Sequence, residues 1–274
     1  MNDRLSSGTP SRPVAVTIAG SDSGGGAGIA ADLKTFEAHG VWGTVAVVAV
    51  TAQNTLGVQA FEAVTPELVR AQITSVVSDL GADAAKTGML ASADVVRSVA
   101  ATVREFGVGP LVVDPVFVSK HGDTLLADDA VGALRDGLLP LAAVLTPNLP
   151  EAAALVGFEV ADRADMEKAA RALVELGPEV VLVKGGHLAG GDSSPDCLLV
   201  DGEEPVWLDG ARIPGRHTHG TGCVLSAAIC AELARGMDPA DACVAAKRFV
   251  ERSITAGVGL GAGVGPVDPG WARR

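Results

Sequence analysis

Short apolar runs that suit buried strands alternate with longer helical patterns along nearly the whole 274-residue chain. Val14–Ile18, for example, leads into a glycine-rich loop, and residues 29–38 then place apolar side chains at helical spacing. Repeated strand–loop–helix units predict parallel strands joined by right-handed crossovers, with helices on both faces of the sheet. We therefore predict an α/β fold with a single doubly wound, mainly parallel sheet.

The same alternation predicts the domain boundaries and the individual elements. No proline-rich or low-complexity linker interrupts it, so we expect one domain at 14–274, preceded by a polar, disordered tail at 1–13. A β-rich patch at 197–213 contains two Asp-Gly turns and predicts a hairpin. Expected strands are 14–18, 44–50, 82–87, 110–113, 142–145 and 180–183, and expected helices are 29–38, 65–80, 92–106, 130–138, 162–176, 221–235 and 239–256.

Composition narrows the range of partners. Aromatic residues make up only 3% of the chain, tyrosine is absent, and the formal net charge is -12. Such a chain offers few stacking surfaces for bases, and it repels phosphate backbones and anionic lipids. We therefore expect no nucleic-acid and no membrane partner, and a bound phosphate must be held locally by backbone N–H groups.

Cysteines and histidines show no metal or disulfide pattern. The cysteines at 197, 223, 230 and 243 include no C-x-x-C pair, which predicts neither a disulfide framework nor a zinc site. His187, His217 and His219 are not spaced as a metal cluster, so we expect them at the surface. No apolar run suits a membrane span or a signal peptide. These features together predict a protein of the reducing cytoplasm.

The loop at 20–28 is rich in glycine, follows a strand and opens a helix, so two nucleotide-binding motifs have to be tested. A Walker A loop needs a lysine and a Ser/Thr at an offset where this chain has neither, and glycines at 24, 26 and 28 do not fit G-x-G-x-x-G. What remains is a loop that permits close approach to its backbone. Asp32, four residues further on, by itself suggests a solvated acid that interacts favourably with the helix dipole.

A second pair of glycines, Gly220 and Gly222, comes directly before an apolar helical run at 224–233. The first N–H groups of a helix lack internal partners and carry partial positive charge, so this loop is a candidate anion site. The alternative is an ordinary helix cap. The same field lowers the pKa of a thiol at a helix start, which makes Cys223 a candidate reactive thiolate.

Polar side chains follow several expected strands. Gln53 can donate and accept together, as an aminopyrimidine or carboxamide edge requires, although its segment also suits a surface turn. Asn148 and Glu151 are typical of a site that holds Mg²⁺ through waters beside a nucleotide phosphate, although Glu151 is also typical of an acid that interacts with the dipole at a helix start. Asp114 has the same two interpretations: a ligand of a metal or water, or an acid in a loop. Lys184 ends an apolar strand, where a lysine is unfavourable unless its side chain faces a site, and this favours contact with a phosphate. The carboxyl ends of parallel strands share one edge, so we expect these side chains to converge there.

Together these motifs resemble the hydroxymethylpyrimidine/phosphomethylpyrimidine kinases of thiamine biosynthesis, in the ribokinase-like superfamily. Two departures are visible: Ala30 replaces a glutamine common in that helix, and Val264–Pro269 lacks histidines that often flank the nucleotide edge. Seven segments in order, within about residues 14–267, show the resemblance: Thr17–Phe36, Thr51–Thr55, Lys86–Leu90, Val113–Val116, Thr146–Glu151, Val183–His187 and His219–Cys223.

The resemblance implies an ATP-dependent kinase that uses Mg²⁺ to phosphorylate 4-amino-5-hydroxymethyl-2-methylpyrimidine and then its monophosphate. It also leads us to expect a homodimer. The residues implied for the pyrimidine pocket are Gln53, which would pair with the ring edge, and Asp32, Gly20, Met89 and Val116. The anion hole would comprise Gly220, Gly222 and Cys223, with Cys223 also placed as the base. Those expected at ATP are Asn148, Lys184 and Thr221, and those expected at the metal are Glu151 and Asp114.

Three other functions have to be weighed. A pyridoxal or pyridoxine kinase of the same fold acts on a similar small heterocycle with a hydroxymethyl group, but Cys223 and the segment around Gln53 favour the pyrimidine. The unsuitable glycine spacing at 20–28 argues against a dinucleotide oxidoreductase. A binding protein without activity is disfavoured by the complete anion loop at 219–223.

Overall fold

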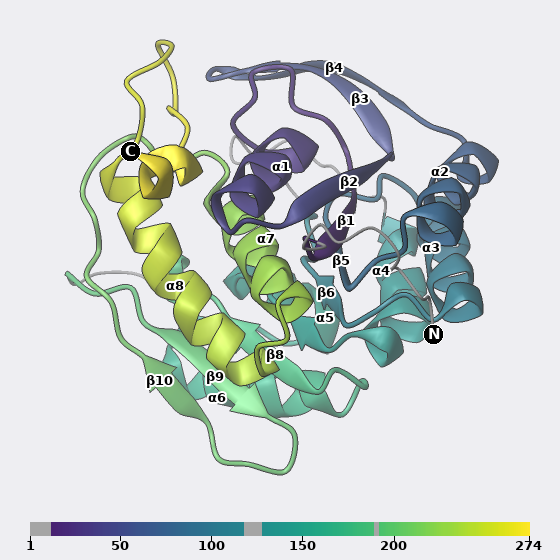
Figure 1. The fold of residues 1–274 in the computed structure, drawn as a ribbon. Coiled ribbons are helices and arrows are strands. Elements are labelled where there is room, and N and C mark those ends of the chain that lie inside the picture. The colour runs from purple at the N-terminus through teal and green to yellow at the C-terminus, as the bar shows by residue number, and fades with distance from the viewer. Residues whose placement is uncertain (1–11, 118–127, 189–191) are drawn as a thin grey trace.

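A central eight-stranded sheet organises the chain in the computed structural model, which describes residues 12–117, 128–188 and 192–274 (Figure 1). The strand order is β10-β9-β8-β7-β6-β5-β1-β2, with parallel pairing from β8 to β2 and antiparallel pairing of β9 with both β8 and β10. The predicted doubly wound, mainly parallel sheet is thereby confirmed. Its strands are β1 Val14–Ala19, β2 Trp42–Val47, β5 Ala84–Thr87, β6 Leu111–Val113, β7 Val144–Leu145, β8 Val180–Val183, β9 Asp196–Val200 and β10 Val206–Leu208.

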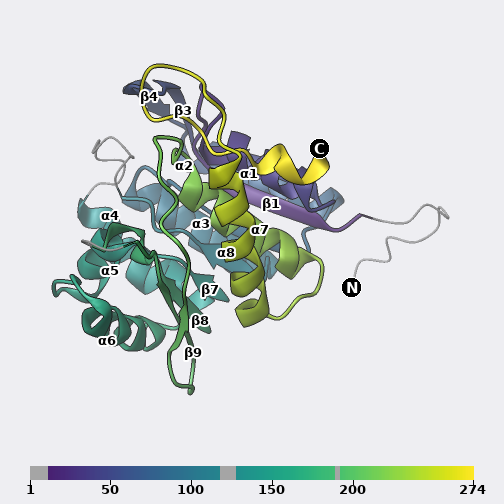
Figure 2. The same ribbon diagram turned by 90° about the vertical axis from the view of Figure 1, so that its left-hand side faces the viewer.

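Helices cover both faces of this sheet, as the two views together show (Figures 1 and 2). One face carries α1 Gly28–Ala38, α7 Thr221–Ala234 and α8 Pro239–Thr255. The other carries α2 Pro66–Asp79, α3 Ala93–Phe106, α4 Asp128–Ala133, α5 Leu149–Val156 and α6 Arg163–Val174. Four short helical turns complete the helices of the described residues: η1 Leu134–Leu138, η2 Leu139–Leu141, η3 Gly185–His187 and η4 Pro269–Arg273.

The strands divide their side chains between the two helical layers. In β6, Val112 packs towards α7 and α8, whereas Val113 packs towards the opposite layer; Leu182 and Val183 of β8 do the same. Successive residues of a strand point to opposite faces, so a sheet covered on both sides needs apolar residues at every position. This is why the central strands are continuous apolar runs.

Helix α7 is buried along most of its length, and this explains its mainly apolar sequence. Its residues from Val224 to Ala234 are all buried, between the sheet, α1 and α8. A helix surrounded by protein has no polar face. Because α7 is held on every side, the position of its first turn is fixed relative to the carboxyl edge of the sheet.

Several boundaries confirm the sequence signals. Thr65 caps α2 through a bond from the backbone N–H of Leu68, and Pro66 occupies the first helical position. Ser92 caps α3, which ends at Gly107 in the left-handed conformation, with φ of 60°. The hairpin expected at 197–213 is present as the antiparallel pair β9 and β10.

One prediction of a single strand was wrong. Residues 44–50 do not form one strand but belong to two: β2 at the edge of the main sheet and β3 Ala49–Asn54, which pairs with β4 Gly57–Ala63 in a separate two-stranded sheet. Val48 lies between them, fully buried, and its N–H donates to the carbonyl of Ala19. The chain therefore turns off the sheet edge at Val48, and the apolar pattern carries no mark of this turn.

Other expected segments differ in smaller ways. The helix expected at 130–138 is divided into α4 and the π-helical turn η1. Of the tail expected at 1–13, residues 1–11 lie outside the described residues, whereas Arg12 forms an ion pair with Glu37 at 2.9 Å and the carbonyl of Pro13 accepts from Trp42. Among the helices in the described ranges, none has both the length and the apolar character to cross a membrane.

Candidate active site

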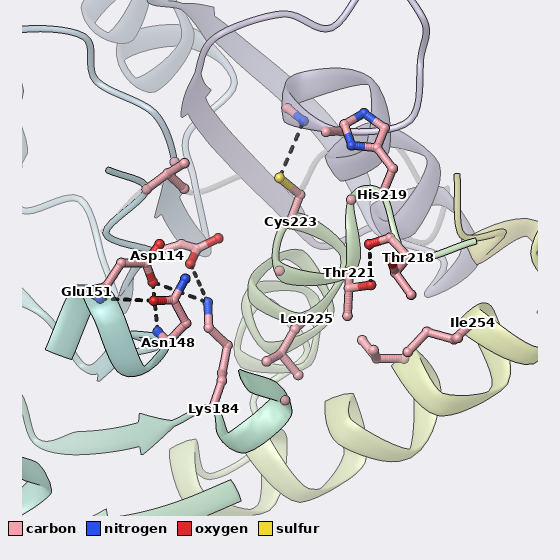
Figure 3. A pocket seen from close by; sticks show the side chains of 18 of the residues that line it. Asp114, Asn148, Glu151, Lys184, Thr218, His219, Thr221, Cys223, Leu225 and Ile254 are labelled. Carbon is pink, nitrogen blue, oxygen red and sulfur yellow. Dashed lines mark hydrogen bonds and ion pairs between the residues drawn. The ribbon is translucent and has the colours of Figure 1, made fainter. Parts of the chain in front are cut away.

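A cavity of about 450 Å³ opens at the carboxyl edge of the sheet, above the first turn of α7. Its walls come from the loops after β1, β5, β6 and β8, from β3, and from the starts of α5 and α7; α8 closes one side (Figure 3). The polar residues expected to converge at this edge do so: Asp114, Asn148, Glu151 and Lys184 all line the cavity.

The start of α7 is shaped by two glycines that have different roles. Gly220 is the N-cap, with φ of 82°, and a Cβ there would lie 1.8 Å from the carbonyl oxygen of Gly26, so only glycine fits. A Cβ on Gly222 would instead point into the cavity, 3.5 Å from Lys184 Nζ and 3.7 Å from Asp114 Oδ2. The first turn of α7, where N–H groups lack internal partners, therefore faces the Lys184–Asp114 pair.

Lys184 lies between two carboxylates. Its Nζ donates to Asp114 Oδ1 at 3.0 Å and is 3.8 Å from Glu151 Oε2. Burial opposes the ionisation of Asp114, but Lys184 and Lys86 hold the pKa of this carboxyl below its usual range. Burial raises the pKa of Glu151 to about 7, against the opposing effect of Lys184. The cluster thus combines a fixed carboxylate, an ammonium group and a carboxyl that titrates near neutral pH.

Asn148 and Glu151 form a capping box at the start of α5. Asn148 Oδ1 accepts from the N–H of Glu151 at 2.9 Å, and Glu151 Oε2 accepts from the N–H of Asn148 at 2.7 Å. The helix-start interpretation of Glu151 is therefore confirmed. It does not exclude a second role, because the same carboxyl group lines the cavity beside Lys184.

The residues at this edge suit a magnesium ion held indirectly. Within residues 12–117, 128–188 and 192–274, no cluster of three or more His, Cys, Asp or Glu side chains is arranged to hold a metal. Mg²⁺ often keeps several waters and takes only one or two carboxylates together with substrate phosphates. Asp114 and Glu151 offer two carboxyl groups on either side of Lys184. The donor set fits water-mediated Mg²⁺ beside a phosphate and does not form a protein cage.

The structure brings together four of the five residues expected at the pyrimidine. Gln53, Gly20, Met89 and Val116 all line the same cavity. Gly28, with φ of 53°, packs so closely on the carbonyl of Gly20 that a Cβ would lie 2.3 Å from its oxygen. The close-approach loop predicted at 20–28 therefore forms one wall of the cavity.

Asp32 departs from both expectations drawn for it. It is neither a solvated first-turn acid nor among the residues that line the cavity, because its side chain is fully buried. Asp32 Oδ1 accepts from Lys86 Nζ at 2.9 Å, and Oδ2 accepts from the Thr17 hydroxyl at 2.6 Å. Burial favours the neutral amine, but Asp32 keeps the pKa of Lys86 above its usual range. Lys86 itself lines the cavity, and no site role was predicted for it.

The prediction that the helix start lowers the pKa of Cys223 was also wrong. Burial raises the pKa of this thiol to about 12, and the nearby carboxylates Asp32 and Asp114 add to the effect. Lys86 and the N–H of Gly28, which lies 3.4 Å from Sγ, act in the opposite direction but do not overcome it. The thiol nevertheless lines the cavity at the helix start (Figure 3). It is protonated at neutral pH in this cavity.

His219 was expected at the surface and is instead buried, with a relative exposure of 6%. Its ring packs on Gly26, where a Cβ would lie 2.5 Å from Cδ2, and its Nε2 lies 2.8 Å from Asp22 Oδ2. Asp22 was not predicted as a site residue. The available signal was an acid inside a glycine loop, where short side chains commonly bond backbone N–H groups.

The fold and this cavity define an α/β protein with a candidate ligand site at the carboxyl edge of its sheet, and comparisons with known proteins specify the class. The sequence model of the phosphomethylpyrimidine kinase family matches residues 22–268. A relative from Streptomyces coelicolor, named hydroxymethylpyrimidine/phosphomethylpyrimidine kinase, is 53% identical over 260 residues, which is 95% of each chain. The chain therefore belongs to the phosphomethylpyrimidine kinase family, and it is a kinase.

Solved structures agree with this assignment. Pyridoxal kinase from Bacillus subtilis, in a complex with ADP, is 39% identical with a TM-score of 0.89, over 96% of this chain and 99% of that chain. Phosphomethylpyrimidine kinase from Clostridium difficile is 37% identical with a TM-score of 0.78, over 89% of this chain and 100% of the other. The predicted ribokinase-like fold is confirmed by these neighbours.

Proposed function

We propose that this kinase transfers the γ-phosphoryl group of ATP to 4-amino-5-hydroxymethyl-2-methylpyrimidine and then to the resulting monophosphate. One observation is the main support for the proposal. The first turn of α7 lies in a single cavity between a pocket that contains Gln53 and a cluster made by Lys184, Asp114 and Glu151. A transferred phosphoryl group needs such a position, with an acceptor on one side and the nucleotide phosphates on the other.

The acceptor pocket would hold the pyrimidine through Gln53. Its carboxamide can donate and accept at once, which matches the ring nitrogen and amino group of an aminopyrimidine. Gly20, Met89 and Val116 would pack on the ring, and Gly20 brings the backbone close because a Cβ there would already touch Met89 Sδ at 3.4 Å. Gln53 thus sets the choice of heterocycle.

The transfer itself would rely on the start of α7. The N–H groups of Gly220, Gly222 and Cys223 would stabilise the charge on the transferred group, as a helix start favours an anion. The thiolate form of Cys223 would take the proton of the acceptor alcohol and become the thiol. Because its pKa is raised to about 12, only the small ionised fraction would act at neutral pH, and the alcohol step should accelerate as pH rises. A monophosphate acceptor is already ionised and would need no such base.

The nucleotide side would be formed by Asn148, Lys184 and Thr221, all of which line the cavity. Lys184 is positioned to contact a phosphate, since its ammonium group lies 3.5 Å from the Cβ position of Gly222. Glu151 and Asp114 would hold Mg²⁺ through waters. When bound, Mg²⁺ would neutralise charge on the phosphate oxygens of ATP.

Pyridoxal is the second candidate acceptor, because the Bacillus subtilis pyridoxal kinase has a similar chain and fold. The test is a comparison of kcat/KM with ATP for four acceptors: the hydroxymethylpyrimidine, its monophosphate, pyridoxal and pyridoxine, with product masses recorded. The proposal predicts that the two pyrimidines are preferred. A higher kcat/KM for pyridoxal than for both pyrimidines would replace it by the pyridoxal function.

We also propose a homodimer that works in the cytoplasm. All four cysteines are free thiols, which suits a reducing compartment. Val50 and Phe61 on the β3–β4 sheet and Leu56 in the turn between these strands expose between 50% and 65% of their surface, and a second copy of the chain would cover such an apolar patch. Light scattering across protein concentrations tests the dimer.

A further inference from the structure

Three side chains from distant parts of the chain meet at the pyrimidine side of the cavity. His219 Nε2 lies 2.8 Å from Asp22 Oδ2 and 3.4 Å from the end of the Gln53 carboxamide. Asp22 belongs to the glycine loop after β1, Gln53 to β3, and His219 directly precedes the start of α7. All three line the cavity, yet the proposed function uses only Gln53.

The proton on Nε2 is determined by its neighbours. Asp22 Oδ1 accepts from the N–H of Gly24, and Oδ2 accepts from the N–H groups of Gly26 and Ala27. Burial opposes ionisation of this carboxyl, but the bonds from His219, Gly24 and Ala27 hold the pKa of Asp22 below its usual range. An ionised carboxylate only accepts, so the short contact to Oδ2 requires Nε2 to carry a hydrogen, whether the ring is neutral or charged.

This hydrogen decides which end of the Gln53 carboxamide faces the ring. The oxygen and nitrogen of a carboxamide have nearly the same shape, and the hydrogen-bond network distinguishes them. An amide NH₂ directed at Nε2 would place two donors against each other, whereas the amide oxygen can share, at 3.4 Å, the single Nε2 hydrogen that Asp22 accepts at 2.8 Å. The stable arrangement therefore has the oxygen beside His219.

We propose that Asp22 and His219 are positioning residues that fix the Gln53 carboxamide with its oxygen towards His219 and its NH₂ group towards the ligand. This inference rests on the proposed function. It defines the ligand class more narrowly. The ligand is a heterocycle whose unprotonated ring nitrogen accepts from the NH₂ group of Gln53, and whose neighbouring amino group donates to the amide oxygen of Gln53. A heterocycle with a carbon at that ring position loses the bond and leaves the NH₂ donor unpaired.

The same pair links acceptor recognition to the anion site. His219 is followed directly by Gly220, and its backbone bonds to Gly265 and Val267 hold the segment that leads into α7. The glycine loop packs on this segment through Gly26, whose oxygen lies 1.8 Å from the Cβ position of Gly220. The residue that orients Gln53 is therefore part of the backbone that places the first N–H groups of α7.

The direct test is the tautomer of His219 in the wild-type protein. Nitrogen-15 spectra of histidine-labelled enzyme, assigned by loss of one ring in His219→Phe, report which nitrogen is protonated. The proposal predicts a protonated Nε2 at about neutral pH. A bare Nε2 with the proton on Nδ1 alone would overturn it. No substrate is needed, so this result stands apart from the proposed function, which fails if the wild type does not phosphorylate the pyrimidine.

The second test measures affinity ratios by calorimetry. The ligands are the hydroxymethylpyrimidine and its analogue with C–H in place of the ring nitrogen next to the amino group. Wild type should bind the parent about tenfold more tightly, the loss expected for one hydrogen bond and a stranded donor. In His219→Phe and Asp22→Asn the ratio should fall to about threefold or less, because the amide is free to turn.

Ser23→Ala is the matched control. The Ser23 hydroxyl bonds the backbone N–H and carbonyl of Gln53, each at 2.8 Å, and so acts on the backbone of Gln53 and not on its carboxamide. This variant should weaken both ligands alike and keep the ratio near the wild-type value. An unchanged ratio in both His219→Phe and Asp22→Asn, or an equal collapse in Ser23→Ala, would show that the pair has only a structural role.

Discussion

Replacing Gly222 by alanine should raise stability and lower turnover at the same time. Gly222 is the second residue of α7, has no positive φ, and its added Cβ would meet neighbours only at 3.5 and 3.7 Å, which is ordinary contact. Exchanging glycine for alanine in a helix stabilises it by about 0.5–1 kcal/mol. We expect a gain of this order, measured by urea unfolding.

The same methyl group occupies the space between the helix start and Lys184, where the transferred phosphoryl group would lie. An anion-hole donor must approach its oxygen to about 2.7–3.1 Å, and losing one such donor costs about 10²–10³-fold in kcat. Gly222→Ala should lose turnover by this order in a coupled assay for ADP. Gly132→Ala in α4, where a Cβ meets nothing within 4 Å, is the control and should gain stability without losing activity. Normal turnover in Gly222→Ala would refute the placement of the transferred group.

Three further predictions concern single side chains. Gln53→Ala should weaken pyrimidine binding by roughly 1–3 kcal/mol in calorimetry, with ATP affinity unchanged, and equal losses for both ligands would assign Gln53 a structural role. Glu151→Gln keeps an acceptor for the capping box but should raise the Mg²⁺ concentration needed for half-maximal activity. Because burial raises the pKa of Glu151 from 4.5 to about 7, the native state binds the extra proton. Wild-type stability should therefore fall as pH rises through this window, and a similar fall in the variant would contradict this account. Cys223→Ala should lose about 10²–10⁴-fold on the alcohol and less on the monophosphate. In the wild type, only the alcohol step should accelerate between about pH 7 and about pH 10, since the thiol pKa lies near 12, and a flat profile excludes Cys223 as the base.

Local signals in the sequence predicted the fold well. Thr65 with Pro66, and Ser92, marked the starts of α2 and α3 because caps are made by neighbouring residues. The turn at Val48 was missed because it depends on a backbone bond to Ala19, in a different strand. An apolar run continues through this turn, so its pattern cannot distinguish one strand from two.

The convergence of polar side chains at one edge of the sheet was predicted from the sequence, whereas the errors at individual residues all involve partners distant in sequence. Asp32 looked solvated because Lys86, 54 residues away, is not visible in a helical pattern. His219 looked exposed because its partner Asp22 is 197 residues away. For Cys223, the field of the helix start was expected to favour a thiolate, but burial has the larger effect on the pKa and depends on the tertiary structure.

The central claim is that one cavity phosphorylates an alcohol and then the phosphate it has produced. The most direct measurement is a single time course with ATP, Mg²⁺ and the hydroxymethylpyrimidine, in which monophosphate and diphosphate are followed by mass. The account predicts that the monophosphate appears first and is then converted to the diphosphate, and that Gly222→Ala slows both steps. ATP hydrolysis without phosphorylated pyrimidine, or a monophosphate that is never converted, would contradict it.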